Sequence, residues 1–371
     1  PGILARIASS APEAALQDIL VEISNSGTEE GVTEAALMTS LRQRKREAHV
    51  LIALCDLAQI FNTEATTGWL TDLAEACTGA AIRYLLRETD SAGKIKLVDR
   101  NDPEKGSGWI VLGMGKFGAR ELNYSSDIDL IVFIDSERPA IIDPYECVDT
   151  FSRMTRRLVR ILQDRTADGY VFRVDLRLRP DPGSTPLAIP VGAALHYYEG
   201  RGQNWERAAM IKARPVAGDR ESGLQFLAEL APYVWRKYLD YAAIADVHSI
   251  KRQIHAHKGH GDIAVRGHNV KLGRGGIREI EFFVQTQQLI AGGRFPELRG
   301  NQTVPMLGRL AECGWITEKA RDALGKEYYF LRDVEHRIQM IADEQTHILP
   351  EDDEGFARVA HMMGYSDPAE F

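Results

Sequence analysis

Two aspartates separated by a single apolar residue make the segment SDIDLIVF, residues 126–133, the first candidate for chemistry in this chain. On an extended strand alternate side chains point to opposite faces, so Asp127 and Asp129 share one face while Ile128 and Leu130 share the other. Adjacent carboxylates repel each other unless a cation lies between them. Because Mg²⁺ is commonly held by one or two carboxylates together with substrate phosphates, the pattern predicts a divalent-metal site. Two solvated aspartates at a strand end are the alternative.

A third carboxylate lies in YVFRVDLRLRP, residues 170–180. Read as a strand, this segment places four charged side chains on one face: Arg173, Asp175, Arg177 and Arg179. Residues 151–180 hold eight arginines and three aspartates, in a chain that is acidic as a whole, and guanidinium groups match phosphate oxygens geometrically. If this strand pairs beside residues 128–134, Asp175 joins the two earlier aspartates. That is the layout of a two-metal phosphoryl-transfer site.

A glycine-rich segment precedes the first two aspartates. Gly113, Gly115 and Gly118 form the pattern G-x-G-x-x-G after the apolar run WIVLGM, as in dinucleotide-binding folds. Such a fold needs a crossover helix of about ten residues or more after the third glycine. Only nine residues, 119–127, separate Gly118 from the next apolar run, and NYSSD among them is typical of a turn. The spacing argues against a dinucleotide site and predicts a short phosphate-facing turn.

The composition excludes several other classes of protein. The chain has 371 residues, enough for two or three domains, and its net charge of −8 argues against a general affinity for nucleic acid or acidic membranes. No apolar run reaches the length of a membrane span, and no signal sequence opens the chain, which begins at Pro1 like a fragment. The cysteines form no C-x-x-C pair, so we expect a cytoplasmic protein without a disulfide or zinc framework: Cys55, Cys77, Cys147 and Cys313.

The elements that would position these residues follow from periodicity. Residues 12–105 predict helices, the polar stretch NDPEKGSG at 101–108 a break, residues 145–164 a helix, and the chain from about residue 222 helices again. Three runs predict the strands of a small sheet: WIVLGM, IDLIVFI and YVFRVDLRLRP. The expected fold class is α+β, mostly helical, with a small mixed sheet at the centre. The expected domains are residues 1–105 (helical), 106–220 (catalytic) and 221–371 (helical).

The order of strand, glycine-rich turn and Asp-apolar-Asp-apolar resembles the nucleotidyltransferase superfamily to which DNA polymerase β belongs. Four segments narrow the resemblance to the bifunctional glutamine synthetase adenylyltransferase/adenylyl-removing enzymes: GMGKFGARELNYSSDIDL, VDLRLRPDPGSTPL, NWERAAMIKARPVAGD and VKLGRGGIREIEFFVQTQQLIAGGRFPELR. NWERAAMIKAR is similar to the N-terminal, adenylyl-removing half of that family, which typically reads WERYAMIKAR. The resemblance covers residues 105–371 well and the first hundred loosely. Phe117, Ala119 and Arg120 depart from the usual KLGGGELN without removing a carboxylate or a glycine of the turn.

The resemblance implies an enzyme that removes AMP from a tyrosine of adenylylated glutamine synthetase by phosphorolysis, with phosphate consumed and ADP released. It implies Mg²⁺ or Mn²⁺ held by Asp127, Asp129 and Asp175, and Arg177 and Arg179 as candidates to bind the attacking phosphate. It also implies a cradle for the AMP phosphate formed by Gly113, Gly115, Lys116, Gly118 and Ser125. The implied regulatory partner is the uridylylated form of the PII signal protein.

Two other functions stay open at this point. Adenylyl transfer from ATP to the same tyrosine would use the same carboxylates, because forward and reverse reactions share one geometry. A non-catalytic module that senses PII is the alternative from another class, although the three aspartates speak against it.

Three further motifs each have two interpretations. The loop from Gly273 to the segment IREIEFF is either a phosphate site at a helix N-terminus or a turn before a core helix. The charged residues of NWERAAMIKAR either reach the site or form structural salt bridges: Glu206, Arg207, Lys212 and Arg214. Four histidines are interpreted as part of a solvated loop rather than a metal site: His255, His257, His260 and His268.

Overall fold

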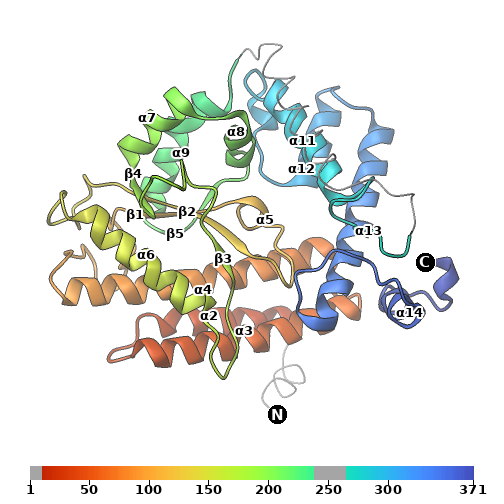
Figure 1. Ribbon diagram of the computed structural model, residues 1–371, viewed down its shortest axis with the longest axis horizontal. Coiled ribbons are helices and arrows are strands. Elements are labelled where there is room, and N and C mark those ends of the chain that lie inside the picture. Colours follow the sequence, from red (N-terminus) through yellow and green to blue (C-terminus); the bar gives the residue numbers. More distant parts are fainter. Residues whose placement is uncertain (1–10, 238–264) are drawn as a thin grey trace.

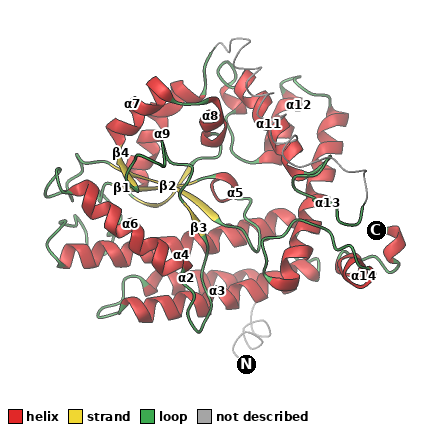
Figure 2. Cartoon of the chain, in the orientation of Figure 1, coloured by secondary structure: helices red, strands yellow, loops and turns green. Residues whose placement is uncertain are grey.

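Helices enclose a small central sheet in the computed structural model of the chain, which describes residues 11–237 and 265–371 (Figures 1 and 2). The architecture is α+β and mostly helical, so the predicted fold class is confirmed. Within the described ranges, no helix combines the length and the apolar character needed to cross a membrane. The bounds of the three predicted domains stay a prediction.

Three long helices precede the sheet: α2 (Pro12–Ser26), α3 (Glu34–Leu57) and α4 (Thr63–Ser91). The sequence sets where α3 and α4 begin, because the side chains of Thr33 and Asn62 accept hydrogen bonds from the backbone N–H groups of Ala36 and Ala65. The prediction that helix continues to residue 105 was wrong. Helix α4 ends at Ser91, because Gly93 has a positive φ of 69° and the segment beyond it forms turns.

The sheet contains five strands: β1 (Trp109–Gly113), β2 (Ile128–Ile134), β3 (Val174–Asp175), β4 (Ala188–Pro190) and β5 (Arg214–Gly218). β1 is antiparallel to both β2 and β5. β2 is parallel to β3 at its beginning and to β4 at its end. The four-residue helix α5 (Gly115–Gly118) follows β1, so no dinucleotide-type crossover helix exists and the short turn that the spacing predicted is confirmed.

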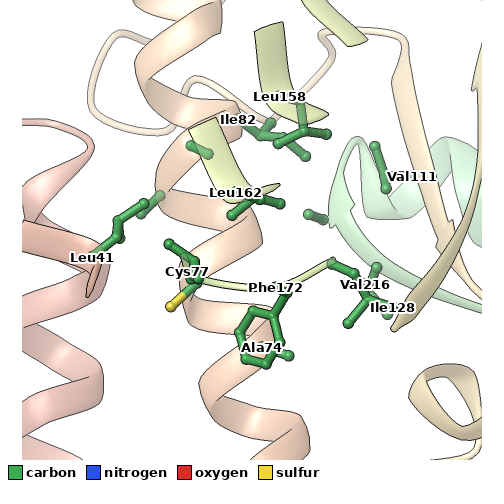
Figure 3. Packing of buried hydrophobic residues seen from close by; sticks show 14 of the residues in the cluster. Leu41, Ala74, Cys77, Ile82, Val111, Ile128, Leu158, Leu162, Phe172 and Val216 are labelled. Carbon is green, nitrogen blue, oxygen red and sulfur yellow. The ribbon is translucent and has the colours of Figure 1, made fainter. Parts of the chain in front are cut away.

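The two faces of the sheet bury different cores. On one face Val111, Ile128 and Val216 pack against α4 and α6 (Cys147–Gln163), as Figure 3 shows together with Cys77 and Leu162. On the other face the alternate residues of β1 and β2 pack against α7 (Val191–Arg201) and α9 (Arg220–Val234): Ile110, Leu112, Ile131 and Phe133. Since side chains alternate along a strand, Asp129 shares the face of Ile131 and Phe133, and Ile128 shares the opposite one.

The remaining helices are α8 (Asn204–Met210), α11 (Ile277–Ala291), α12 (Thr303–Glu312), α13 (Glu318–Ala342) and α14 (Asp353–Met362), with short 3₁₀ turns at Pro296–Leu298 and Pro368–Glu370. Figure 1 shows α11, α12 and α13 on one side of the sheet and α14 farther out, near the C-terminus. The helix α13 runs past α5 toward the N-terminal helices. The prediction of a helical C-terminal region is confirmed for the described residues.

Candidate active site

Two of the predicted carboxylates are brought together by strand pairing. β2 and β3 are parallel, with Asp129 in register with Asp175 and Ile128 in register with Val174. Residues in register on neighbouring strands are about 4.8 Å apart and point to the same face. Asp127, two positions before Asp129, contributes a charge that Asp129 senses. Strand pairing therefore brings Asp129 and Asp175 together at the edge of the sheet, but the described residues do not group all three aspartates around a common point, so that convergence stays a prediction.

The glycine-rich turn packs directly against Asp129. The backbone N–H of Met114 donates to the carbonyl oxygen of Asp129 at 2.9 Å, and Gly115 has φ +51°. A Cβ atom at Gly115 would lie 2.8 Å from Asp129 Oδ2, and one at Gly118 would lie 1.9 Å from the carbonyl oxygen of Lys212. The first of these glycines brings the turn to the carboxylate, and the second lets two backbone segments touch.

Replacing Gly115 with alanine is expected to lower the free energy of unfolding by about 1–2 kcal/mol, the cost of the left-handed conformation for a residue with a Cβ. It should also displace the carboxylate of Asp129. Urea denaturation followed by circular dichroism measures the loss. Gly308→Ala in α12 is the matched control, because its Cβ would meet no atom within 4 Å and alanine favours helices. Equal stability of the two variants would contradict the close approach.

Arginines pair with the two carboxylates that flank Asp129. Arg173 Nε donates to Asp127 Oδ1 at 2.5 Å, and the same guanidinium donates to the hydroxyl of Tyr170 and the carbonyl of Ser125, both at 2.8 Å. Arg177 donates to the carboxylate of Asp175, although its own side chain is 85% exposed. Arg173 is thus anchored on three sides, whereas Arg177 can leave its partner at little cost.

An open cleft of about 590 Å³ adjoins these pairs. It is lined by Asp127, Asp175 and the arginines just described, together with Arg165, Gln163 and Tyr170. A cleft with three guanidinium groups beside carboxylates suits a ligand that carries both phosphate oxygens and a bound cation.

The ionised form of Asp129 is disfavoured in the site. Burial, followed by the nearby charges of Asp175 and Asp127, raises the pKa of Asp129 to about 7, and Lys271 and Arg177 oppose this only in part. The hydrogen bond from Arg177 lowers the pKa of Asp175. A cation placed among these groups would relieve the repulsion at Asp129.

The carboxylate oxygens of the site are the type of ligand that a divalent metal prefers, but their present arrangement does not form a metal site. In the part of the chain that the structure describes, no three His, Cys, Asp or Glu side chains are grouped ready to hold an ion. Asp127 and Asp175 face arginines instead. Because Arg177 is exposed, Asp175 and the strained Asp129 are the pair most easily freed for oxygen ligation of Mg²⁺ or Mn²⁺.

The prediction of one long arginine-bearing strand was wrong. β3 has only two residues, because the carboxylate of Asp175 accepts the backbone N–H of Arg177 at 2.8 Å and closes a turn. Arg177 therefore lies in a turn at the rim of the cleft. Arg179 donates to the carbonyl oxygens of Leu176 and Pro182, at 2.9 and 2.7 Å, so it stabilises that turn.

The turn residues predicted to cradle a phosphate are engaged elsewhere. Lys116 Nζ lies 3.0 and 2.9 Å from the two carboxylate oxygens of Glu335 on α13, and burial lowers the pKa of this lysine to about 7. The hydroxyl of Ser125 donates to the carbonyl of Asp343 at 3.0 Å. The N–H of Gly118 donates to the carbonyl of Met114. A phosphate-binding role for these groups, and for Gly113, stays a prediction, and it would require these bonds to change.

The charged residues of NWERAAMIKAR are structural. Glu206 caps α8 by accepting the N–H of Gln203, and Lys212 pairs with Glu121 at 3.0 Å. Arg207 and Arg214 donate to backbone carbonyls. The loop that begins at Gly273 leads into α11, whose Ile277 and Ile280 are buried, as the turn interpretation predicts. Of the four histidines, His255, His257 and His260 lie outside the described residues.

Sequence reasoning missed two residues beside the site. Tyr170 lines the cleft and accepts the hydrogen bond of Arg173. Lys271 contributes a positive charge at Asp129 and has no ion-pair partner among the described residues, which makes it a candidate for binding substrate. The available signal for Lys271 was its place in the glycine-rich segment VKLGRGG. The sequence carries no comparable signal for Tyr170, because the position of its ring depends on the path of the loop that contains it.

A small mixed sheet that presents carboxylates next to a glycine turn, set among helices, defines a nucleotidyltransferase-like protein. Residues 5–229 match the family described as glutamate-ammonia ligase adenylyltransferase, and the chain belongs to that family. Residues 248–371 match the family described as GlnD PII-uridylyltransferase. The family predicted from the motifs is therefore confirmed.

Curated relatives show the same kinship over the whole chain. The chain is 86% identical over 371 residues to the bifunctional glutamine synthetase adenylyltransferase/adenylyl-removing enzyme of Brucella melitensis, and 68% identical to that of Mesorhizobium japonicum. A protein of the same name from Bradyrhizobium sp. is 56% identical over 368 residues, or 99% of this chain. The chain spans 38% of the length of the first two relatives and 37% of the third. The matched part belongs to their N-terminal half.

Proposed function

We propose that this chain removes AMP from the adenylylated tyrosine of glutamine synthetase by metal-dependent phosphorolysis. The observation that carries the proposal is the pairing of Asp129 in register with Asp175, where Lys271 and Arg177 offset the repulsion at Asp129 only in part. The matched relatives are named for both adenylyl transfer and adenylyl removal. The similarity of NWERAAMIKAR to the adenylyl-removing half favours removal.

In the proposed reaction an oxygen of inorganic phosphate bonds to the phosphorus of the AMP group. The bond from that phosphorus to the tyrosine oxygen breaks, ADP leaves, and the phenolate takes a proton from water. A divalent ion, Mg²⁺ or Mn²⁺, supplies neutralisation of charge on the phosphoryl oxygens when it is bound by Asp127, Asp129 and Asp175. No strong general base is required, because phosphate near neutral pH already has unprotonated oxygens.

The arginines of the cleft have separate roles in this proposal. Arg177 is exposed at the rim, and its guanidinium releases Asp175 and then binds the incoming phosphate. Arg173 fixes the direction of Asp127 through its contacts with Tyr170 and Ser125. Arg179 keeps the turn after β3 in place and so positions Arg177. Lys271, whose charge acts on Asp129, offers a further cation.

Regulation by the uridylylated PII protein and a cytoplasmic location belong to the same proposal. Residues 248–371 match a family named for PII uridylylation, and this match supports a link to PII. A chain related to a protein that recognises PII can retain part of the surface that binds PII.

Supplying the two possible substrate pairs separately tests the direction of the reaction. With adenylylated glutamine synthetase, phosphate and Mg²⁺, we expect ADP to form in equal amount to the tyrosine that is freed, as measured by chromatography and intact mass. Both assays include uridylylated PII. With unmodified glutamine synthetase and ATP, we expect no adenylylation. Transfer from ATP without ADP release from the modified enzyme would establish the opposite direction. The absence of both reactions would favour a non-catalytic module.

A further inference from the structure

A second cavity, of about 370 Å³, shares Tyr170 with the carboxylate cleft. One of its walls is a face of α3 that carries basic side chains at helical spacing: Arg42, Lys45, Arg46 and His49. The opposite wall comes from the end of α13, with Gln339, Met340 and Asp343. We refer to this cavity as the α3 pocket. Nothing in the proposed phosphorolysis uses it.

Lys45 is the most unusual residue of the α3 pocket. Its side chain is nine-tenths buried, with 9% relative exposure, and no carboxylate lies within ion-pair distance among the described residues. The contact recorded for its ammonium is with the ring of Tyr170, 5.2 Å from the centroid. Burial lowers the pKa of Lys45. The charge of Asp343 opposes this shift only in part. A buried ammonium without an ion pair is costly, so an anion beside it would be favoured.

The side chains beside Lys45 on α3 provide no negative charge. The guanidinium of Arg42 donates to three backbone carbonyls, those of Met38, Asp164 and Gly169, so no carboxylate cancels its charge by a hydrogen bond. Nε2 of His49 is shielded from solvent and has no hydrogen-bond partner. Burial, followed by repulsion from Lys45, holds the pKa of His49 well below its usual range, so the ring is neutral. It can donate one hydrogen bond to a ligand.

The carboxylates of the α3 pocket do not reach Lys45 closely. Asp168 is half-buried in the lining and forms no ion pair with Lys45. Asp343 accepts a hydrogen bond from the hydroxyl of Tyr170 at 3.4 Å. Three cations therefore face two carboxylates across the lining. The rest of the wall is apolar, with Val50, Ala53 and Met340.

We propose that the α3 pocket is a binding site for a small organic anion. Its carboxylate or phosphate group pairs with Lys45 and accepts a hydrogen bond from His49. Its apolar part rests on Val50, Ala53 and Met340. The inference does not depend on the proposed phosphorolysis, because it concerns other residues and another ligand. The shared Tyr170, which accepts the hydrogen bond of Arg173, places the bound anion one aromatic ring away from the residue that orients Asp127.

Calorimetric titration of the chain with malonate and, separately, with methylphosphonate tests the site. We expect saturable binding of at least one probe, and the probe that binds identifies a carboxylate or a phosphate-like ligand. Lys45→Met should weaken binding at least tenfold. The matched control Lys326→Met, at an exposed position of α13, should leave it unchanged. Arg177→Ala should also leave it unchanged, because Arg177 lines the other cleft.

Val50→Trp gives a second variant in case Lys45→Met folds poorly. Val50 is 40% exposed at the pocket, so the larger ring should fill the cavity from outside and abolish binding without disturbing the core. Absence of binding by both probes would overturn the proposal. Binding that survives Lys45→Met and Val50→Trp but is lost in Arg177→Ala would overturn it as well, because it would place the anion in the carboxylate cleft.

Discussion

Asp129→Asn is expected to reduce ADP release from adenylylated glutamine synthetase by about 1,000-fold or more. A carboxylate that helps to hold a divalent ion supports several kcal/mol of transition-state charge stabilisation, and every 1.36 kcal/mol changes the rate tenfold. Asparagine retains the size of the side chain but not its charge. The rate is measured with phosphate, Mg²⁺ or Mn²⁺ and uridylylated PII present.

The same substitution should stabilise the metal-free protein above neutral pH. Asp129 has a folded pKa of about 7, raised first by burial and then by Asp175 and Asp127 from an ordinary value of 3.8. The folded state therefore binds a proton more tightly than the unfolded state, and stability is lost as pH rises from about 4 through 7. Asparagine removes this loss, so the variant should exceed the native chain by an amount on the order of a few kcal/mol at pH 8 and by almost nothing near pH 4.

Asp18→Asn on α2 provides the control for both measurements, because Asp18 is exposed and far along the chain from the site. Its rate and its unfolding profile should match those of the native chain. Near-normal ADP release from a folded Asp129→Asn protein would remove Asp129 from the mechanism and with it most of the two-metal argument. A stability gain that does not depend on pH would instead refute the electrostatic description of Asp129.

The face on which Asp129 lies could be predicted from sequence, because a strand has a strict period of two and a buried face leaves no freedom of register. The alternation with Ile128 and Leu130 decides which side chains enter the core, and both aliphatics are fully buried. The short span after Gly118 likewise excluded a crossover helix. The length of β3 was not predictable in this way, because the turn that ends it depends on where the Asp175 carboxylate finds a donor.

The partners of Lys116 and Ser125 were beyond sequence reasoning for a different reason. Both residues contact α13, which lies more than two hundred positions further along the chain. Local patterns carry no information about such pairs, since the motif GKFG looks the same whether its lysine faces a phosphate or a buried glutamate. The turn beside Asp129 is held by the C-terminal helical region, so the site is a property of both parts of the chain.

Glu335→Gln is expected to lower the free energy of unfolding by about 3–5 kcal/mol, because it leaves buried cations without their carboxylate. Glu335 has no exposed surface. Its oxygens lie 2.9 Å from Lys116 Nζ, 3.3 Å from Arg332 Nε and 2.9 Å from His347 Nδ1. Burial alone would raise the pKa of Glu335, but the charge of Lys116, with His347 and Arg332, holds it well below the usual range. The carboxylate is therefore ionised, and glutamine cannot replace its charge.

Urea denaturation at neutral pH measures this loss, and Glu354→Gln on α14 is its matched control. Glu354 also pairs with an arginine, Arg358, but 86% of its side chain is exposed, so the control should lose no more than about 0.5 kcal/mol. Combining Glu335→Gln with Lys116→Met should recover part of the stability, since one unpaired charge then disappears. Equal losses for Glu335→Gln and Glu354→Gln would show that α13 does not hold the glycine turn through this ion pair. The position of Asp129 would then depend on the sheet alone.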